Sequence, residues 1–131
     1  MKRLSLITVV AVVSAGCGEA PSPLAGGKPV AHWVSALQDP DAKLRTTAVF
    51  RLGNVGPTDA AVLPALLGAL KDSDARVRRE AILALMKCGP DARAAVPALN
   101  EIRRRDPDPK VRDHAARALE KIDGESAAGS Q

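Results

Sequence analysis

Residues 72–89 have the sequence DSDARVRREAILALMKCG, and this stretch decides the fold because the chain repeats it twice more with small changes. The earlier copy, residues 39–56, is DPDAKLRTTAVFRLGNVG, and the later copy, residues 106–124, is DPDPKVRDHAARALEKIDG. The copies start 33 and then 34 positions apart. A repeat of this length indicates a solenoid of stacked helical pairs, in which no single pair buries its apolar face alone.

Each copy predicts a turn and a helix, and a shorter apolar helix precedes the turn. Within residues 57–89 the first helix is expected over residues 60–70, where apolar residues recur at helical spacing. A turn follows in which Asp72 or Ser73 caps the second helix. Gly89-Pro90 ends that helix, because glycine adopts the left-handed conformation that closes a helix and proline cannot continue it. The second helix is expected to bury Val77, Ala81, Leu85 and Cys88.

This pattern resembles HEAT repeats, particularly the short type found in phycobilisome lyase-related proteins. The resemblance covers residues 30–123 and implies an all-α fold, a right-handed α-solenoid of three HEAT-like helical hairpins at residues 29–56, 57–89 and 90–123. It also implies a ladder in which turn aspartates bind arginines of the second helices across neighbouring repeats, since a guanidinium fork can hold a carboxylate and free carbonyls together. The matching residues are Asp41, Asp74 and Asp108 with Arg45, Arg78 and Arg112.

Two positions depart from the repeat pattern. Trp33 falls where Leu66 and Leu99 fall in the later units. Two interpretations of Trp33 stay open: it fills the otherwise open N-terminal end of the stack, or it stacks on a ligand. In the third unit Asp123-Gly124 replaces the Gly-Pro stop signal, and the small, polar residues 124–131 are expected to form a disordered tail.

The N-terminus predicts export. Two basic residues precede an apolar stretch at residues 4–13, which leads into Ser14-Ala15-Gly16-Cys17. These features predict a secretory signal peptide over residues 1–16, and the apolar stretch falls short of the roughly 20 residues that cross a bilayer as a helix. Its end resembles the lipobox of bacterial lipoproteins, which implies cleavage before Cys17 and lipidation of that residue. Ser14 departs from the lipobox, where leucine is usual.

The predicted setting is the extracytoplasmic side of a membrane in the cell envelope, with Cys17 as the lipid anchor. Residues 17–28 would then be the lipidated N-terminus and a flexible linker, since Gly, Pro and Ser dominate them without helical period. Ordinary secretion, with cleavage after Ala20, remains the alternative.

Charge argues against nucleic-acid binding. The whole chain has a formal charge of +4, but Lys2 and Arg3 belong to the predicted signal peptide. The remainder has 17 basic and 15 acidic side chains. A protein that neutralises a phosphate backbone needs a larger basic surplus.

The sequence offers little chemistry. His32 and His114 lie more than two repeats apart, so they are not expected to share a metal. Cys88 is the one thiol besides Cys17 and lies on an apolar helix face, where a free cysteine behaves as a small hydrophobe. The Asp-rich turns lack the spaced ligands of a calcium loop. We therefore predict no metal, no cofactor and no catalytic activity.

Two surface groups are candidates for contacts. The exposed flank of the second helices is expected to carry a partner-binding set, or alternatively to pack the junctions between repeats. Residues 103–105, three arginines, either bind anionic headgroups or are a solvated helix end. The partner-binding set is Phe50, Arg51, Leu83, Met86, Lys87 and Arg117.

Together these features predict a non-enzymatic protein–protein interaction scaffold at the bacterial cell envelope. Its partners would be another protein and, through the N-terminal lipid, a membrane, with no nucleic acid. The alternative that the resemblance brings is an accessory subunit of an enzyme or of a bilin lyase-like cofactor-attachment system. A shared repeat does not by itself carry a shared function.

Overall fold

The computed structural model describes residues 24–128, with side chains described through residue 124. A β-hairpin with strands of two residues each comes first, and six α-helices follow, with 3₁₀ segments after α2 and α4. The elements are β1 (Leu24–Ala25), β2 (Lys28–Pro29), α1 (Val30–Ala36), α2 (Ala42–Val55), η1 (Gly56–Thr58), α3 (Val62–Ala69), α4 (Ala75–Cys88), η2 (Gly89–Ala95), α5 (Val96–Arg105) and α6 (Pro109–Ala128). The expected all-α solenoid is confirmed. The predicted signal peptide, Cys17 and residues 129–131 lie outside the described residues.

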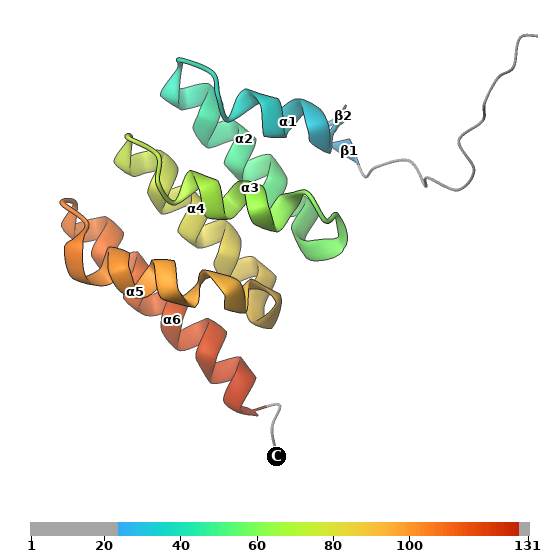
Figure 1. Ribbon diagram of the computed structural model, residues 1–131. Coiled ribbons are helices and arrows are strands. Elements are labelled where there is room, and N and C mark those ends of the chain that lie inside the picture. Colours follow the sequence, from blue (N-terminus) through green and yellow to red (C-terminus); the bar gives the residue numbers. More distant parts are fainter. Residues whose placement is uncertain (1–23, 129–131) are drawn as a thin grey trace, which may run out of the picture.

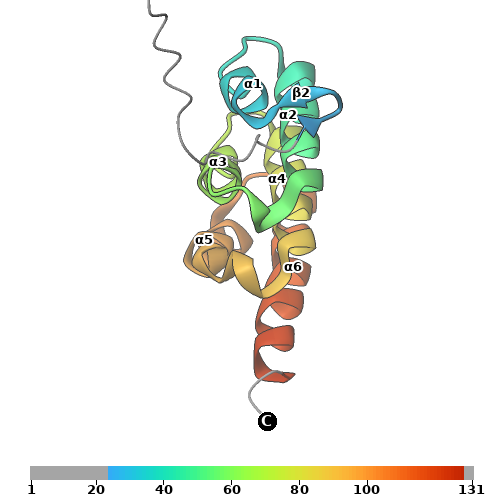
Figure 2. The same ribbon diagram turned by 90° about the vertical axis from the view of Figure 1, so that its right-hand side faces the viewer.

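The helices form two layers, with α1, α3 and α5 in one and α2, α4 and α6 in the other (Figure 1, Figure 2). Successive pairs stack in chain order. Helix α2 packs along α4, and α4 packs along α6, whereas α1 and α3 touch at few positions. The second layer is therefore the tightly packed side of the stack, and the first layer is splayed.

One continuous hydrophobic seam joins the three helical pairs. Alanines at corresponding positions of the second helices are fully buried, which lets these helices approach closely: Ala48, Ala81 and Ala115. Leucines one turn further on are buried beside them: Leu52, Leu85 and Leu119. The stripe that the sequence predicts to be buried on α4 is buried as expected. Each pair lends its neighbour the apolar surface that neither can bury alone.

An aspartate precedes each second helix and caps it. The carboxylates accept the backbone amide two residues further on, at 2.7 to 2.9 Å, and the residues are Asp41, Asp74 and Asp108. Such a cap satisfies an amide that the helix leaves free and places negative charge at the positive end of the helix dipole. The expectation that Asp72 or Ser73 caps α4 is wrong, because the helix begins later in the turn than the sequence indicates.

Helix α6 continues past the position where the sequence predicts its end. Gly56 and Gly89 have φ of 71° and 59°, close their helices, and are each followed by proline. Gly124 is followed by glutamate, and α6 runs on to Ala128. A glycine inside a helix costs only about 1 kcal/mol relative to alanine, so it does not stop a helix without help. The predicted disordered tail is therefore wrong for residues 124–128.

A short hairpin replaces part of the predicted flexible linker. β1 and β2 pair antiparallel, with Leu24 opposite Pro29. The two turn residues, Gly26 and Gly27, have φ of 59° and 78°, which is the backbone conformation that a two-residue hairpin requires. The Nε1 of Trp33 donates to the carbonyl oxygen of Ala25 at 2.6 Å and fastens the hairpin to α1. The prediction of a structureless linker is therefore wrong for residues 24–28.

Candidate functional site

An arginine near the start of each of the first two second-layer helices binds the turn of the next repeat. The Nε and Nη2 atoms of Arg45 donate to both carboxylate oxygens of Asp72, at 2.9 and 3.1 Å. Its Nη1 donates to the carbonyl oxygen of Asp39 in its own turn, at 2.8 Å. Arg78 makes the same pair with Asp106, at 2.8 and 3.0 Å. These largely buried, bidentate pairs tie consecutive turns together.

The aspartates of this ladder differ from the predicted ones. Each turn carries two aspartates separated by one residue, and the ladder uses the first, while the second caps the helix. The carboxylate of Asp74, for example, accepts amide and side-chain hydrogen bonds from Arg76, which lower its pKa to about 2. Its oxygens are thus occupied at its own helix and do not bind the arginine of the preceding repeat. The assignment of Asp41, Asp74 and Asp108 as ladder carboxylates is wrong for this reason.

The last rung of the ladder is incomplete. The Nη1 of Arg112 donates to the carbonyl oxygen of Asp106 at 2.6 Å, as the other two arginines do in their own turns. Within residues 24–124, no carboxylate accepts a hydrogen bond from its Nε or Nη2. The arginine is therefore part of its own turn only.

The structure brings Phe50 and Lys87 of the predicted partner-binding set into contact across the α2–α4 boundary. The Nζ of Lys87 lies 5.0 Å from the centroid of the Phe50 ring and donates to Asn54 at 3.2 Å. Phe50 remains 43% exposed, so this cation–π contact leaves much of the ring open. Leu83 is half-buried and occupies the corresponding position of α4, and Arg117 occupies it on α6 and pairs with Asp113.

Two members of the predicted set lie elsewhere. Met86 is half-buried and packs against the hydrophobic core, so it is junction filling. Arg51 lies over the ring of Trp33, at 5.9 Å from its centroid, and against Gly26 of the hairpin. The second-layer surface is therefore defined here by Phe50, Leu83, Lys87 and Arg117.

The second layer also carries most of the positive charge. Helices α2, α4 and α6 contain 11 basic and 5 acidic side chains, whereas α1 and α3 contain no lysine, arginine or carboxylate. Residues 103–105 add basic charge at the last turn of α5, where cations favour the carbonyl end of a helix. Arg105 pairs there with Glu101 at 3.2 Å, while Arg103 and Arg104 are exposed.

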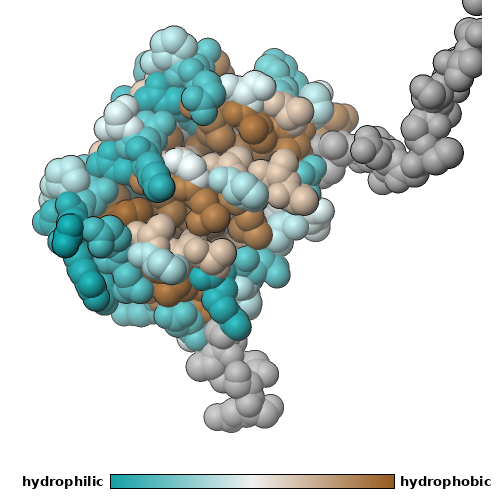
Figure 3. Space-filling view, viewed as in Figure 1, coloured by the Kyte–Doolittle hydropathy of each residue, from teal (hydrophilic) through white to brown (hydrophobic). Residues whose placement is uncertain are grey.

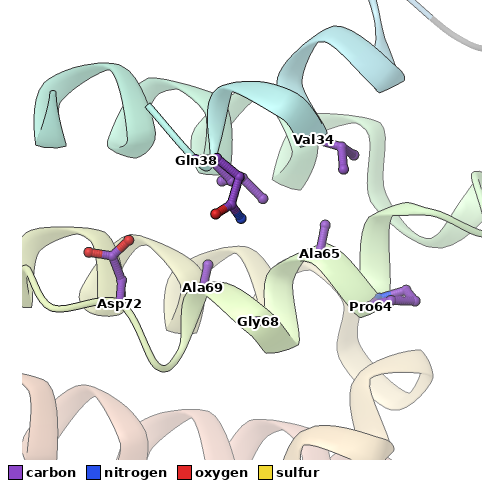
Figure 4. Close-up of a pocket in the computed structure, with 8 residues that line it drawn as sticks. Val34, Gln38, Pro64, Ala65, Gly68, Ala69 and Asp72 are labelled. Atoms are coloured by element: carbon purple, nitrogen blue, oxygen red, sulfur yellow. The ribbon is translucent and has the colours of Figure 1, made fainter. Parts of the chain in front are cut away.

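The first layer contains an apolar valley that the sequence analysis does not predict. Figure 3 shows hydrophobic bands between the first-layer helices. A pocket of about 340 Å³ lies between α1 and α3, where Val34 and Gln38 face Ala65 and Ala69 across it (Figure 4). Gly68 lies beside them, and a Cβ there would meet nothing within 4 Å. Small residues at successive turns of α3 are the signal that indicates such a valley.

The described residues hold little reactive chemistry. Burial raises the pKa of the Cys88 thiol, which disfavours the nucleophilic thiolate. Among residues 24–124, no group of three or more His, Cys, Asp and Glu side chains gathers as a metal would require. In the same part of the chain, no helix combines the length and apolar character needed to cross a membrane.

Comparison with known proteins identifies the repeat. Residues 30–120 match the family model described as HEAT repeats. No curated protein matches the chain. The match spans all three helical pairs of the stack.

Proposed function

The chain belongs to the HEAT-repeat family, and on this premise we propose that it is a non-catalytic scaffold that binds another protein at the bacterial cell envelope. Stacked helical repeats present extended surfaces suited to protein binding. The proposed anchor is a lipid on Cys17, supported by the charged and apolar segments that precede it and by the lipobox-like Ala15-Gly16-Cys17.

The observation that carries the proposal is the exposed aromatic ring of Phe50 on the basic second layer. A large apolar side chain 43% exposed on a folded surface is a candidate contact anchor. Lys87 lies over the ring and has no carboxylate partner among residues 24–124. A partner segment with an apolar side chain flanked by carboxylates fits this surface best, since its charges would complement Lys87 and the basic excess of the second-layer helices.

The apolar valley between α1 and α3 is a second candidate surface for the same function. Its pocket is large enough to take an apolar side chain, and its walls are largely uncharged apart from Asp72. Asp72 already binds Arg45, so it offers no free charge to a partner. A partner in the valley would therefore bind without ion pairs, and its affinity should depend little on salt.

Site-specific photocrosslinking in the native cell tests the choice of surface. A photoreactive residue replaces Leu83 on the second layer, Gln38 at the valley, or Ala31 as an exposed control on α1. We expect a discrete protein adduct from position 83 and none from position 31. Leu83→Asp should weaken the captured complex at least tenfold while helicity by circular dichroism stays unchanged, since an anchor loses its apolar contact. Adducts from position 38 alone would move the site to the valley.

The mass of the mature N-terminus tests the setting separately. A lipidated Cys17 as the first residue is expected. An unmodified chain that begins after Ala20 would contradict the anchor and leave the scaffold proposal standing.

A further inference from the structure

The hairpin end of the stack carries an exposed apolar side chain. Leu24 is 66% exposed, the largest exposed fraction among the described large hydrophobic residues. Lys28 is exposed on the neighbouring strand. The hairpin lies at the end of α1 opposite the α1–α2 turn (Figure 1), so the Asp-rich turns are far from it.

The guanidinium of Arg51 lies under this hairpin without a counter-ion. The backbone of Gly26 lies flat against it, since a Cβ on Gly26 would come within 2.7 Å of its Nη1. The Nε of Arg51 is buried and has no hydrogen-bond partner among the described residues. The three ladder arginines, in contrast, all donate to carbonyl or carboxylate oxygens. The Nε is enclosed, so the Nη atoms are the part of this guanidinium that can take an anion from outside.

A pocket of about 260 Å³ lies beside this guanidinium. It is lined by the hairpin and by the last turns of α2, with Leu24, Ala25 and Gly26 on one side and Asn54 and Val55 on the other. Residues 24–38 and α2 contain no aspartate or glutamate. The hairpin and α2 thus combine a cationic pocket with an exposed leucine and contribute no carboxylate of their own.

The path of the chain places this same end next to the anchor. Only six residues separate Cys17 from Leu24. A chain of seven residue steps spans at most about 25 Å, whatever its conformation. A lipid on Cys17 would therefore keep the hairpin within about 25 Å of its anchor in the bilayer surface.

We propose that the hairpin end docks on anionic phospholipid, with a lipid phosphate at Arg51 and Lys28 and with Leu24 in the membrane interface. The proposal rests on the proposed anchor at Cys17 for its geometry and adds the lipid class that the stack recognises. A basic side chain near an anionic surface strengthens membrane contact about fivefold. An apolar side chain at the interface adds to this contact.

Trp33 provides the test, because it is the only tryptophan of the chain and contacts the hairpin directly. The full chain is added to vesicles of phosphatidylcholine, alone or mixed with phosphatidylglycerol, whose acyl chains are brominated. Flotation reports attachment, and quenching of Trp33 fluorescence reports contact of the hairpin end with lipid. We expect quenching roughly twofold stronger in the phosphatidylglycerol vesicles.

Three variants separate docking from attachment. The measured ratio is quenching in the phosphatidylglycerol vesicles divided by quenching in phosphatidylcholine alone. Arg51→Gln should lower this ratio to about one because it removes the phosphate ligand. Leu24→Asp should do the same because it removes the contact with the membrane interface. Lys121→Gln removes an exposed basic side chain of α6 and should leave the ratio unchanged. Because the ratio is taken within each variant, any change that Arg51→Gln makes in the intrinsic fluorescence of Trp33 affects both measurements equally and drops out of the ratio.

The possible results distinguish this inference from the proposed anchor. Flotation with both lipids and a ratio near one in the unaltered chain would overturn the docking and leave the anchor standing. Flotation only with phosphatidylglycerol, dependent on Arg51, would support the docking and contradict the anchor. If inorganic phosphate changes Trp33 emission through Arg51 and phosphatidylglycerol vesicles do not quench it, the pocket takes a free anion and the docking is overturned.

Discussion

Equivalent positions of the repeats carry different side chains at the α2–α4 boundary and at the two ends of the stack. Inside the stack Gly53 faces Ala84 so closely that a Cβ on the glycine would come within 2.7 Å of the alanine Cβ. At the C-terminal end the position of Gly53 is taken by the exposed Glu120. At the N-terminal end the position of Ala84 is taken by Arg51, which the hairpin covers. At the α2–α4 boundary small residues let the next repeat approach closely, whereas charged residues hold these positions where no repeat packs among the described residues. Met86 holds the position of Gly53 on α4 and fills the next boundary.

Exposure of the first apolar residue of each second helix shows the same contrast. Val77 and Val111 are 0% and 1% exposed, because a preceding repeat covers them. Leu44 holds their position in the first repeat and is 36% exposed. The hairpin and Trp33 pack on each other at this end and leave Leu44 partly exposed. Stability should therefore depend more on the internal boundaries than on the ends.

Widening the internal boundary should have the largest effect. We expect Gly53→Val to lower the free energy of unfolding by about 3 kcal/mol, since the added side chain collides with Ala84 and pushes α2 from α4. Thermal unfolding followed by circular dichroism measures the loss.

The matched control for this change is another glycine inside a helix. A Cβ on Gly68 would meet nothing within 4 Å, so Gly68→Ala should raise stability by about 1 kcal/mol through helix propensity alone. Two substitutions with effects of the same sign would contradict close packing at the α2–α4 boundary.

Removal of an internal rung should cost more than removal of the terminal one. We expect Arg78→Ala to lower the free energy of unfolding by about 2 kcal/mol, because the carboxylate of Asp106 stays largely buried and loses its partner. The melting temperature should fall by roughly 10 °C in a domain of this size. Arg112→Ala should cost about 0.5 kcal/mol or less, since no carboxylate depends on it. Equal losses in denaturant titrations of the two variants would remove the distinction between boundary and end.

Loosening the N-terminal cap should have a smaller effect. Trp33→Phe keeps the apolar ring but loses the hydrogen bond from Nε1 to the carbonyl oxygen of Ala25. We expect a loss of about 1 kcal/mol. Amide hydrogen exchange should speed up in the hairpin and leave α4 unchanged. If the rate of amide hydrogen exchange rises throughout the stack, the hairpin stabilises the whole core and does more than cover its N-terminal end.

The smallest effect concerns pH at one internal cap. The pKa of Asp74 is about 2 in the folded chain against 3.8 for a free aspartate, so its contribution to stability is present above about pH 4 and is lost as the pH falls toward 2. Asp74→Asn keeps an N-cap acceptor but cannot ionise. The variant should lose less stability than the unaltered chain between pH 4 and pH 2, as urea titrations at each pH would measure. Parallel curves would place the titration on other carboxylates.

Much of the fold was predictable because the repeats carry the same signals three times. The apolar stripe of α4, the glycine stops at residues 56 and 89, and the order of the helical pairs all follow from local periodicity and backbone chemistry. Two local features were missed. Gly26-Gly27 between two short apolar stretches is a hairpin signal that is weak when the strands have two residues each. Gly124 lacks the proline that stops the other helices, and a lone glycine does not end a helix.

The ladder shows where sequence reasoning stops. Two aspartates per turn are both suited to bind an arginine and both suited to cap a helix. Which one caps depends on the residue at which the helix begins, and such boundaries are uncertain by one or two residues. Asp72 and Asp74 therefore exchange the roles that the sequence indicates. The small residues of α3 indicate the valley between α1 and α3 only in part, because its width also depends on the spacing between the two helices, which no single helix encodes.

A double-mutant cycle tests most directly the claim that the first aspartate of each turn joins neighbouring repeats. Arg78→Ala is combined with Asp106→Ala in one cycle and with Asp108→Ala in another, with free energies of unfolding from urea titration. We predict a coupling of about 2 kcal/mol between Arg78 and Asp106 and about zero between Arg78 and Asp108, since only the first pair shares hydrogen bonds. A coupling confined to Asp108, or equal in both cycles, would contradict the account.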